Sequence, residues 1–438
     1  MRDYWDKRAR AIRVAYGCQI QQALRSFDPD RRTVILIPGG MASQLDRSHR
    51  PYTEMHGPWR GSPVWMSRET ITRRNARLIM MQADGRDADD HIIVPNRELR
   101  YGIKAYAGMD RFFSGAGDGG YNYLVFGYDW RRPFAESADW LHHYLVTLRR
   151  AVRRRFGAVS DPLARTTLVC HSQGGLIAKT FLERFRGTGE ALDWMEQVVT
   201  VGTGFYGVTN HQARYFAGIP PLNVFYGSRT VARIVASTPA PYALMPLSYP
   251  VFERYHEQLG LGRDEYPVVD AYSGQPMDPY SRRAEHRYPQ WMNLEYLSRA
   301  RGVLEMIARP LQRDVARRFF NIRSLCNPAT TTRQTWTARP ERSVGLMRRW
   351  LGSSPLGVLS TGGGDGHVPH WSGFHASTPP GNRAELTQVD KHHEIARHPE
   401  ALRIVEAIIE TGRVPARPLP GRGSASEGSG AVPQPGVS

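Results

Sequence analysis

The stretch TTLVCHSQGGLIAKTF, residues 166 to 181, changes its hydrophobic pattern at Ser172. Before the serine, TTLVC is β-branched and apolar, which predicts a short buried strand. After it, the apolar residues of GGLIAKTFLERF follow a helical spacing. The pattern therefore places Ser172 on a strand-to-helix turn. There it is either an exposed nucleophile or a polar link, such as an N-cap, between two buried elements.

Strands and helices alternate along the rest of the chain. Two amphipathic helices are expected, ADWLHHYLVTLRRAVRRRFG (138–157) with an arginine-rich outer face and PEALRIVEAIIETG (399–412), which Gly412 closes. This alternation predicts an α/β protein with a doubly wound, mostly parallel sheet. The other segments that we expect to be buried strands running into turns are TVILIPG (33–39), YNYLVFGYDW (121–130), VVTVGTG (198–204) and GVLSTGGGDG (357–366).

Two stretches break this rhythm and are too long to be ordinary loops of a compact domain. Residues 46–110 are rich in Arg, Pro and Trp, and residues 205–350 carry many Tyr, Pro, Trp and Met. Within a single domain spanning 1–413, we expect a lid insertion and a cap insertion over the C-terminal edge of the sheet. The aromatic and Met residues of the cap form its core or line an apolar acyl-chain pocket. The Pro/Gly/Ser-rich tail, 414–438, is expected to be disordered.

The overall composition excludes several classes of protein. An apolar fraction of 41% supports a substantial core and excludes wholesale disorder. No transmembrane run and no signal-peptide h-region are visible, so a cytoplasmic location is the default expectation, with signal-independent export left open. The three cysteines, Cys18, Cys170 and Cys326, are too few and too scattered for a disulfide framework or a zinc site.

The formal net charge of +17 comes almost entirely from arginine, and genome composition is one explanation for it. We expect no nucleic-acid partner, because the chain has no helix-turn-helix, zinc-finger or RNP-like signature and its basic residues are spread along the sequence. Peripheral contact with an anionic membrane or lipid headgroup fits the charge better. The sequence does not indicate the oligomeric state.

The residues around Ser172 form a variant of the nucleophile elbow, which commonly reads G-x-S-x-G. Its glycines let a strained turn pack tightly while the serine oxygen stands clear. Here the pattern is CHSQG (170–174), with cysteine in place of the first glycine. A second signal is the loop PGGMASQLD (38–46), whose two glycines let the backbone approach a substrate as in an oxyanion hole. A plain glycine turn is the alternative interpretation of that loop.

Several segments, in order from about residue 33 to 411, resemble motifs of the lecithin:cholesterol acyltransferase family, which includes lysosomal-type phospholipases. PGGMASQLD resembles the family's PGxxGxxLE loop, and CHSQGG resembles its HSMGG elbow. The segments similar to its PYDWR, post-elbow strand, cap and GDGTVP acid loop are FGYDWRRP (126–133), VGTGFYG (201–207), STPAPYALMP (237–246) and GGGDGHVP (362–369). The chain departs from the family at Cys170 and at His367, which replaces a threonine, and it lacks the lid cysteines of secreted animal members. The resemblance implies an α/β-hydrolase fold with a large inserted cap.

The resemblance and the chain order Ser, Asp, His of this fold assign the expected roles. Ser172 is the nucleophile, His392 is the general base, and Asp365 orients that base. The backbone N–H groups of Met41 and Gln173 form the oxyanion hole.

Three alternatives to these roles remain. His393 is the rival base, disfavoured because setting Ile395 at the family's aliphatic position puts His392 at the base. Asp129 is a rival carboxylate, expected to be structural because it precedes the serine. A metal site at His367 and His370 is less favoured than their lining the mouth of the site.

The expected activity is that of a serine acyl hydrolase or O-acyltransferase. It would cleave a lipid ester, in the first place a glycerophospholipid, and pass the acyl group from an acyl-enzyme to water or an alcohol. No metal or organic cofactor is expected. The alternatives are an esterase for a soluble ester or polyester, and a catalytically inactive lipid-binding protein.

Overall fold

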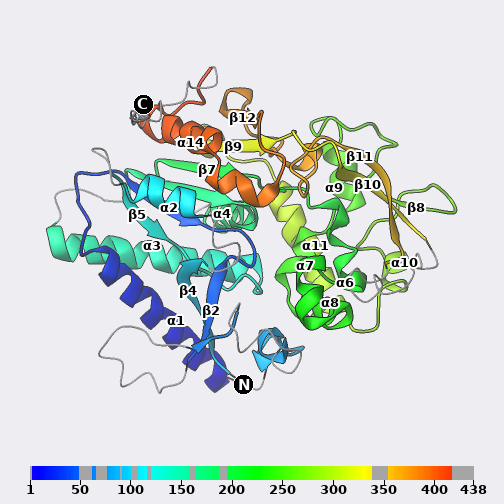
Figure 1. Cartoon of the computed structure of the whole chain (residues 1–438), viewed down its shortest axis with the longest axis horizontal. Helices are drawn as coiled ribbons and strands as arrows, with labels where there is room; N and C mark the ends of the chain where they lie inside the picture. Colours follow the sequence, from blue (N-terminus) through cyan, green and yellow to red (C-terminus); the bar gives the residue numbers. More distant parts are fainter. Residues whose placement is uncertain are drawn as a thin grey trace, which may run out of the picture.

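The computed structural model of this chain describes residues 2–48, 62–65, 76–88, 91–99, 106–115, 120–157, 164–186, 195–337 and 354–416. Figure 1 shows a lobe built on a central sheet beside a second lobe made largely of short helices. Residues 417–438 of the expected tail lie outside the described residues, as do parts of the two expected insertions. Among the described helices, none combines the length and the apolar character needed to cross a membrane.

The central sheet has six strands in the order β12-β9-β7-β6-β1-β5, and every neighbouring pair is parallel. The expected doubly wound, mostly parallel sheet is therefore confirmed. Its strands are β1 (Thr33–Ile37), β5 (Asn122–Val125), β6 (Thr166–His171), β7 (Gln197–Val201), β9 (Phe319–Ser324) and β12 (Arg383–Leu386).

Helices cover both faces of this sheet, which is why its central strands are continuously apolar. Ile35 and Ile37 of β1 belong to one apolar cluster, whereas Val34 and Leu36 belong to another on the opposite face. The first face carries α1 (Arg2–Ala23), α3 (Phe134–Phe156) and α4 (Gln173–Arg184), and the second carries α2 (Ala107–Phe113) and α14 (Pro399–Thr411). Helices α3 and α14 confirm the two amphipathic helices expected from the sequence, and Gly412 closes α14 with φ 67°.

Helix α1 was not expected, because the charged N-terminus was interpreted only as lacking a signal peptide. Its buried residues, which include Ile12, Tyr16 and Ile20, recur at helical spacing. This stripe packs against the central core. The charged residues of the helix are exposed except Arg8, which is buried and pairs with Asp129 and Glu136.

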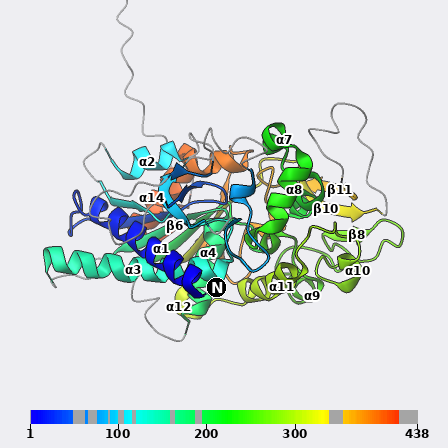
Figure 2. The same cartoon turned by 90° about the horizontal axis from the view of Figure 1, so that it is seen from below.

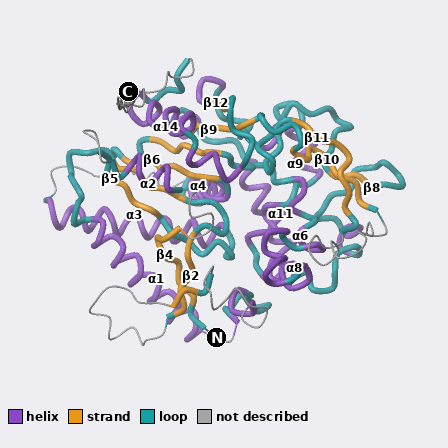
Figure 3. The backbone as a smooth tube through the Cα atoms, viewed as in Figure 1, coloured by secondary structure: helices purple, strands orange, loops and turns teal. Residues whose placement is uncertain are grey.

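Two smaller sheets flank the central one (Figure 3). The first joins β3 (Ser62–Pro63), β2 (Ser43–Arg47) and β4 (Ile93–Leu99), and the second joins β11 (Leu356–Gly362), β10 (Thr330–Trp336) and β8 (Val268–Asp270). β11 confirms a strand at the start of the expected segment 357–366, but the expectation that this strand is buried is wrong, since it pairs with β10 outside the central sheet. Val358 is 64% exposed and Leu359 is 45% exposed. A short apolar run does not by itself indicate which sheet it joins.

The cap lobe, defined here as residues 205–318 with β10 and β11, consists mainly of short helices. The expected cap extended to residue 350, but β9 within that stretch is a strand of the central sheet. Both Figure 1 and Figure 2 show α8 on the side of the cap lobe nearest to the sheet lobe. The α-helices of the cap lobe are α6 (Arg214–Ala217), α7 (Pro220–Tyr226), α8 (Ser228–Ser237), α9 (Tyr249–Tyr255), α10 (Arg282–Glu285), α11 (Leu294–Ala308) and α12 (Arg313–Ala316).

Candidate active site

Ser172 occupies the turn between β6 and α4, as its sequence context predicts. Its φ of 54° lies in the left-handed region, which only Met41 shares among the described non-glycine residues. A side chain at Gly174 would collide with the carbonyl of Ile37, and one at Gly175 with Thr203. The turn is therefore strained and tightly packed, as a nucleophile elbow requires.

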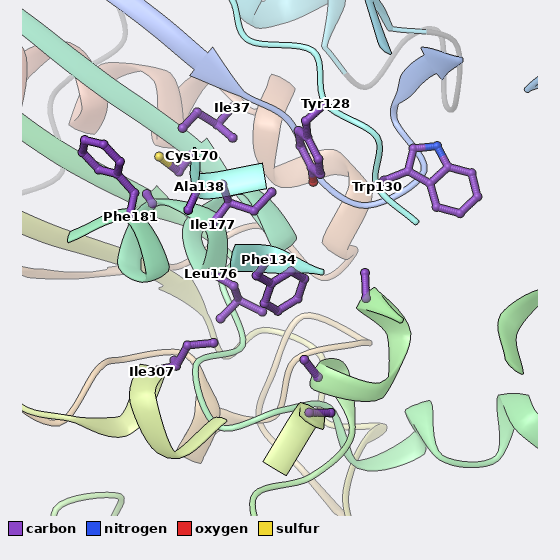
Figure 4. Close-up of a cluster of buried hydrophobic side chains, with 14 of the residues drawn as sticks. Ile37, Tyr128, Trp130, Phe134, Ala138, Cys170, Leu176, Ile177, Phe181 and Ile307 are labelled. Atoms are coloured by element: carbon purple, nitrogen blue, oxygen red, sulfur yellow. The ribbon is translucent and has the colours of Figure 1, made fainter. Parts of the chain in front are cut away.

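The cysteine that replaces the first elbow glycine lies beneath this turn. Cys170 is fully buried in the apolar cluster between sheet and helices. Figure 4 shows it beside Ile37 of β1, Ala138 of α3 and Ile177 of α4. A small apolar side chain therefore fits at this position, and burial raises the pKa of the Cys170 thiol so that it stays protonated.

The serine hydroxyl is bonded to a histidine rather than to the helix end. Ser172 is at the N-cap position of α4 but makes no capping hydrogen bond. Its Oγ lies 2.8 Å from His392 Nε2, and His392 Nδ1 lies 2.7 Å from Asp365 Oδ2. The structure thus brings together, in the expected order, the three side chains that the sequence selected.

The carboxylate of Asp365 is held by its own turn. Its side chain is only 2% exposed, and its Oδ1 accepts hydrogen bonds from the backbone N–H groups of His367 at 3.0 Å and Val368 at 2.7 Å. The other oxygen, Oδ2, is left to face His392. This division fixes the orientation of the carboxylate toward the imidazole.

The two rival residues lie outside this arrangement. The side chain of His393 is 62% exposed, and its Nε2 lies 3.9 Å from Glu394. Asp129 accepts hydrogen bonds from Arg131 at 2.9 and 2.8 Å within a buried cluster of ionic groups. Burial alone would raise the pKa of Asp129, but the neighbouring guanidinium groups outweigh it and hold that pKa below its usual value.

The expected oxyanion residues lie in the wall of the same cavity as the serine. Trp65 Nε1–H donates to the Met41 carbonyl at 2.6 Å and thereby fixes its left-handed peptide. A side chain at Gly40 would collide with the amide of Gln173, whose Nε2–H donates to the Trp130 carbonyl at 3.1 Å. The oxyanion loop and the elbow are thus packed directly on each other. Trp65 had not been singled out in the sequence, and Trp130 had been named only as part of the segments YNYLVFGYDW and FGYDWRRP.

Another residue not singled out, Tyr106, contacts both segments. Its hydroxyl accepts from Gly39 N–H at 2.7 Å and lies 2.7 Å from His171 Nδ1. His171 Nε2 in turn lies 3.3 Å from the backbone carbonyl of His392. Tyr106 falls within the expected lid insertion, where no pattern distinguishes it from the other aromatic residues.

A cavity of about 450 Å³ opens from the serine into the cap lobe. Its inner walls are apolar and come from α7, α8 and the 3₁₀ helix η5 (Ala240–Leu244). The apolar lining residues of these elements are Leu222, Val231, Ile234, Val235 and Leu244. The cavity thus combines the polar groups around the serine with apolar cap walls, a lining suited to an ester with an apolar chain.

His367, at the position where the similar GDGTVP motif carries a threonine, also lines the cavity. His367 lies with its ring centroid 5.0 Å from that of His392, and Arg214 Nη2 lies 3.2 Å from each of its ring nitrogens. Burial, with Arg214 adding to it, lowers the pKa of His367 well below its usual value, so the ring is neutral. His370 is not among the lining residues. Within the described residues, no three His, Cys, Asp or Glu side chains gather as a metal site.

The architecture is similar to that of solved proteins. A chain in the crystal structure of the Tle4–Tli4 complex superposes with a TM-score of 0.56 at 15% identity, over 86% of this chain and 98% of that chain. This chain has an α/β-hydrolase fold. The mature form of the Bacillus licheniformis lipase BlEst2 aligns with a TM-score of 0.35 at 11% identity, over 87% of this chain and 93% of that chain. No protein-family model matches the sequence, and no curated protein matches it.

The α/β-hydrolase fold explains where the site residues lie. In this fold the nucleophile follows a central strand, and one oxyanion donor comes from the loop after an early strand. Ser172 follows β6 and Met41 follows β1, which are neighbouring inner strands of the sheet. Membership in the lecithin:cholesterol acyltransferase family stays a prediction from the motifs.

Proposed function

We propose that this α/β-hydrolase is a serine acyl hydrolase that cleaves a lipid ester through an acyl-enzyme. The observation that carries the proposal is the Ser172–His392–Asp365 hydrogen-bond chain, with spacings of 2.8 and 2.7 Å, in the wall of a cavity that also has apolar walls from the cap. The fold alone hosts many chemistries, so the proposal depends on this site and not on the fold.

In the proposed reaction, Ser172 Oγ attacks the ester carbonyl while His392 Nε2 takes its proton. Asp365 stabilises the imidazolium that forms, and the N–H groups of Met41 and Gln173 bind the oxyanion. Collapse of the tetrahedral intermediate breaks the ester C–O bond, and His392 returns the proton to the departing alcohol. Water or a second alcohol then attacks the acyl-enzyme by the same steps in reverse.

The cavity supports a lipid as the substrate class. An acyl chain that lies against the walls formed by α7 and α8 contributes about 0.8 kcal/mol of favourable binding free energy for each buried methylene. The resemblance of the motifs to those of phospholipid-cleaving enzymes makes a glycerophospholipid the first substrate to test. The formal charge of +17 favours peripheral contact with an anionic lipid surface.

The test is covalent labelling with a fluorophosphonate, which reacts with an activated serine. The native protein should label at Ser172, and Ser172→Ala should not label while keeping its melting temperature. Ser114→Ala is the matched control, because Ser114 is exposed at the end of α2 and should leave labelling unchanged. Undiminished labelling of Ser172→Ala would contradict the proposal.

Product analysis decides among the alternatives. Mass spectrometry of products from mixed phospholipids, with and without an added alcohol, identifies the leaving group and the acyl acceptor. A lipid-ester enzyme should show a rate increase when its substrate passes from monomers to aggregates. An esterase for soluble esters should show none, and an inactive lipid-binding protein should not label at all.

A further inference from the structure

A continuous chain of hydrogen bonds joins the oxyanion loop to the backbone of the base histidine. Gly39 N–H donates to Tyr106 Oη at 2.7 Å, Tyr106 Oη lies 2.7 Å from His171 Nδ1, and His171 Nε2 lies 3.3 Å from the His392 carbonyl. Tyr106 and His171 are 3% and 4% exposed, so water does not compete for these bonds.

The position of every proton in this chain follows from chemistry. The His392 carbonyl can only accept, so His171 must carry its proton on Nε2. Burial, together with the neighbouring His392, lowers the pKa of His171 to about 3, so its ring is neutral and its Nδ1 bears no proton. The Tyr106 hydroxyl therefore donates to Nδ1 while it accepts from Gly39. All of the bonds point in one direction, from the oxyanion loop to the base.

The packing around the chain leaves little room for its members to move. An added Cβ at Gly39 would lie 3.0 Å from His171 Nδ1 and 3.2 Å from Ser172 Cβ. Tyr106 is the N-cap residue of α2, and this helix contacts the segment that begins at His392. An added Cβ at Gly108 of α2 would lie 2.8 Å from Arg397 Cα in that segment. Tyr106 is thus held by both the loop and the segment that it connects.

We propose that Tyr106 is a positioning residue that couples the oxyanion loop to His392 through His171, and this role rests on the proposed acyl-transfer function. Tyr106 touches no reacting atom. Tyr106 fixes the peptide of Gly39, which is two residues before Met41. It also favours the His171 tautomer that donates a hydrogen bond to the His392 carbonyl. Because His171 bonds the backbone carbonyl of His392, the His392 ring stays available to Ser172 and Asp365.

Tyr106→Phe is the first test, because it removes the hydroxyl and keeps the ring. Displacing reacting groups by about 1 Å costs on the order of 10²-fold in rate, so kcat and the rate of fluorophosphonate labelling should fall by about 10- to 100-fold. KM should change little, whereas the melting temperature should fall modestly because Gly39 N–H and His171 Nδ1 lose their buried partner. The matched control is Tyr123→Phe on β5. This change removes a hydroxyl that donates to Asp110 of α2 at 2.7 Å, and it should keep full activity.

Variants of His171 test whether the effect runs through the chain. His171→Gln keeps an N–H that reaches the His392 carbonyl and should retain more activity than His171→Ala. The double variant Tyr106→Phe/His171→Ala should lower kcat by a smaller factor than the product of the factors for the two single variants. Full activity of Tyr106→Phe, or independent effects of the two changes, would overturn the proposal.

A spectroscopic readout separates this proposal from the proposed function. In ¹⁵N spectra, His171 should be protonated at Nε2 in the native protein, and Tyr106→Phe should change both that signal and the low-field signal of the His392 Nδ1 proton. This result, without labelling of Ser172, would disprove the acyl-enzyme but retain the coupling. Labelling of Ser172 with unchanged histidine signals in Tyr106→Phe would disprove the coupling alone.

Discussion

His392 Nε2 lies 2.8 Å from Ser172 Oγ, although 220 positions of sequence separate the two residues. The serine is fixed by the strained turn between β6 and α4, and the histidine begins the 3₁₀ helix η8 (His392–Arg397) just before α14. The bond between them therefore depends on how α14 and its preceding loop dock on the sheet.

Replacing Asp365 by Asn should lower kcat by about 10⁴-fold, because the amide favours the wrong tautomer of His392. Steady-state hydrolysis of a chromogenic ester measures the effect. Asp390→Asn is the control, since Asp390 is an exposed carboxylate that lines the same cavity. Near-normal turnover of Asp365→Asn would place the acid elsewhere.

Separate alanine variants of the adjacent histidines should differ sharply. His392→Ala should lose at least about 10³-fold in kcat, whereas His393→Ala should remain within a few-fold of the native rate. The reason is that His392 bonds both Ser172 and Asp365 while the side chain of His393 is 62% exposed. If His393→Ala proves the less active of the two, the assignment is off by one residue.

Asp129→Asn should lower stability and leave the chemistry intact. Its carboxylate offsets the buried guanidinium groups of Arg131 and Arg132, and breaking such a cluster costs about 3–5 kcal/mol. Because the folded pKa of Asp129 is depressed, its stabilisation is present above the unfolded pKa of about 3.9 and is lost as pH falls toward the folded value.

The melting temperature of Asp129→Asn should therefore be lower at pH 7, and its further decrease in acid should be shallower than that of the native protein. Thermal unfolding followed by circular dichroism measures both effects. The measurements run from about pH 7 down to about pH 3, which is below the pKa of an unfolded Asp carboxyl group. Native stability with a large loss of kcat would instead indicate that Asp129 is the catalytic acid.

Leu222→Trp should shift the preference of the enzyme toward esters with shorter acyl chains. Leu222 lines the cavity from α7, and each methylene that the cavity no longer accepts forfeits about 0.8 kcal/mol, roughly fourfold in kcat/KM. Long-chain esters should therefore lose more than short-chain esters. Val224→Trp on the same helix is the control, since Val224 is 49% exposed and outside the cavity lining. Equal effects on short and long chains would contradict an acyl pocket here.

Binding to anionic vesicles should weaken as salt increases. The formal charge is +17, and exposed charges are screened within about 10 Å at 0.1 M ionic strength. Sedimentation with vesicles of phosphatidylglycerol, and with phosphatidylcholine vesicles as the neutral control, measures this. Equal binding to both lipids would argue against an electrostatic contribution.

The sequence by itself determined the central part of the fold and the identity of the candidate triad. The change from β-branched to helical spacing at Ser172 is a local pattern, and β6 and α4 have nearly the expected bounds. The same holds for α14 and for the glycine-rich turn that holds Asp365. These features are readable because strand, turn and helix preferences act between residues close in sequence.

Only the tertiary structure decided which strands join the central sheet and what surrounds the serine. The apolar segment of β11 lies in a small sheet, whereas β9, inside the expected cap, pairs with β7. Tyr106 reaches His171 across 65 positions, and no periodicity announces such a bond. Hydrogen bonds and packing between distant segments depend on the closed three-dimensional arrangement, and local sequence patterns do not encode them.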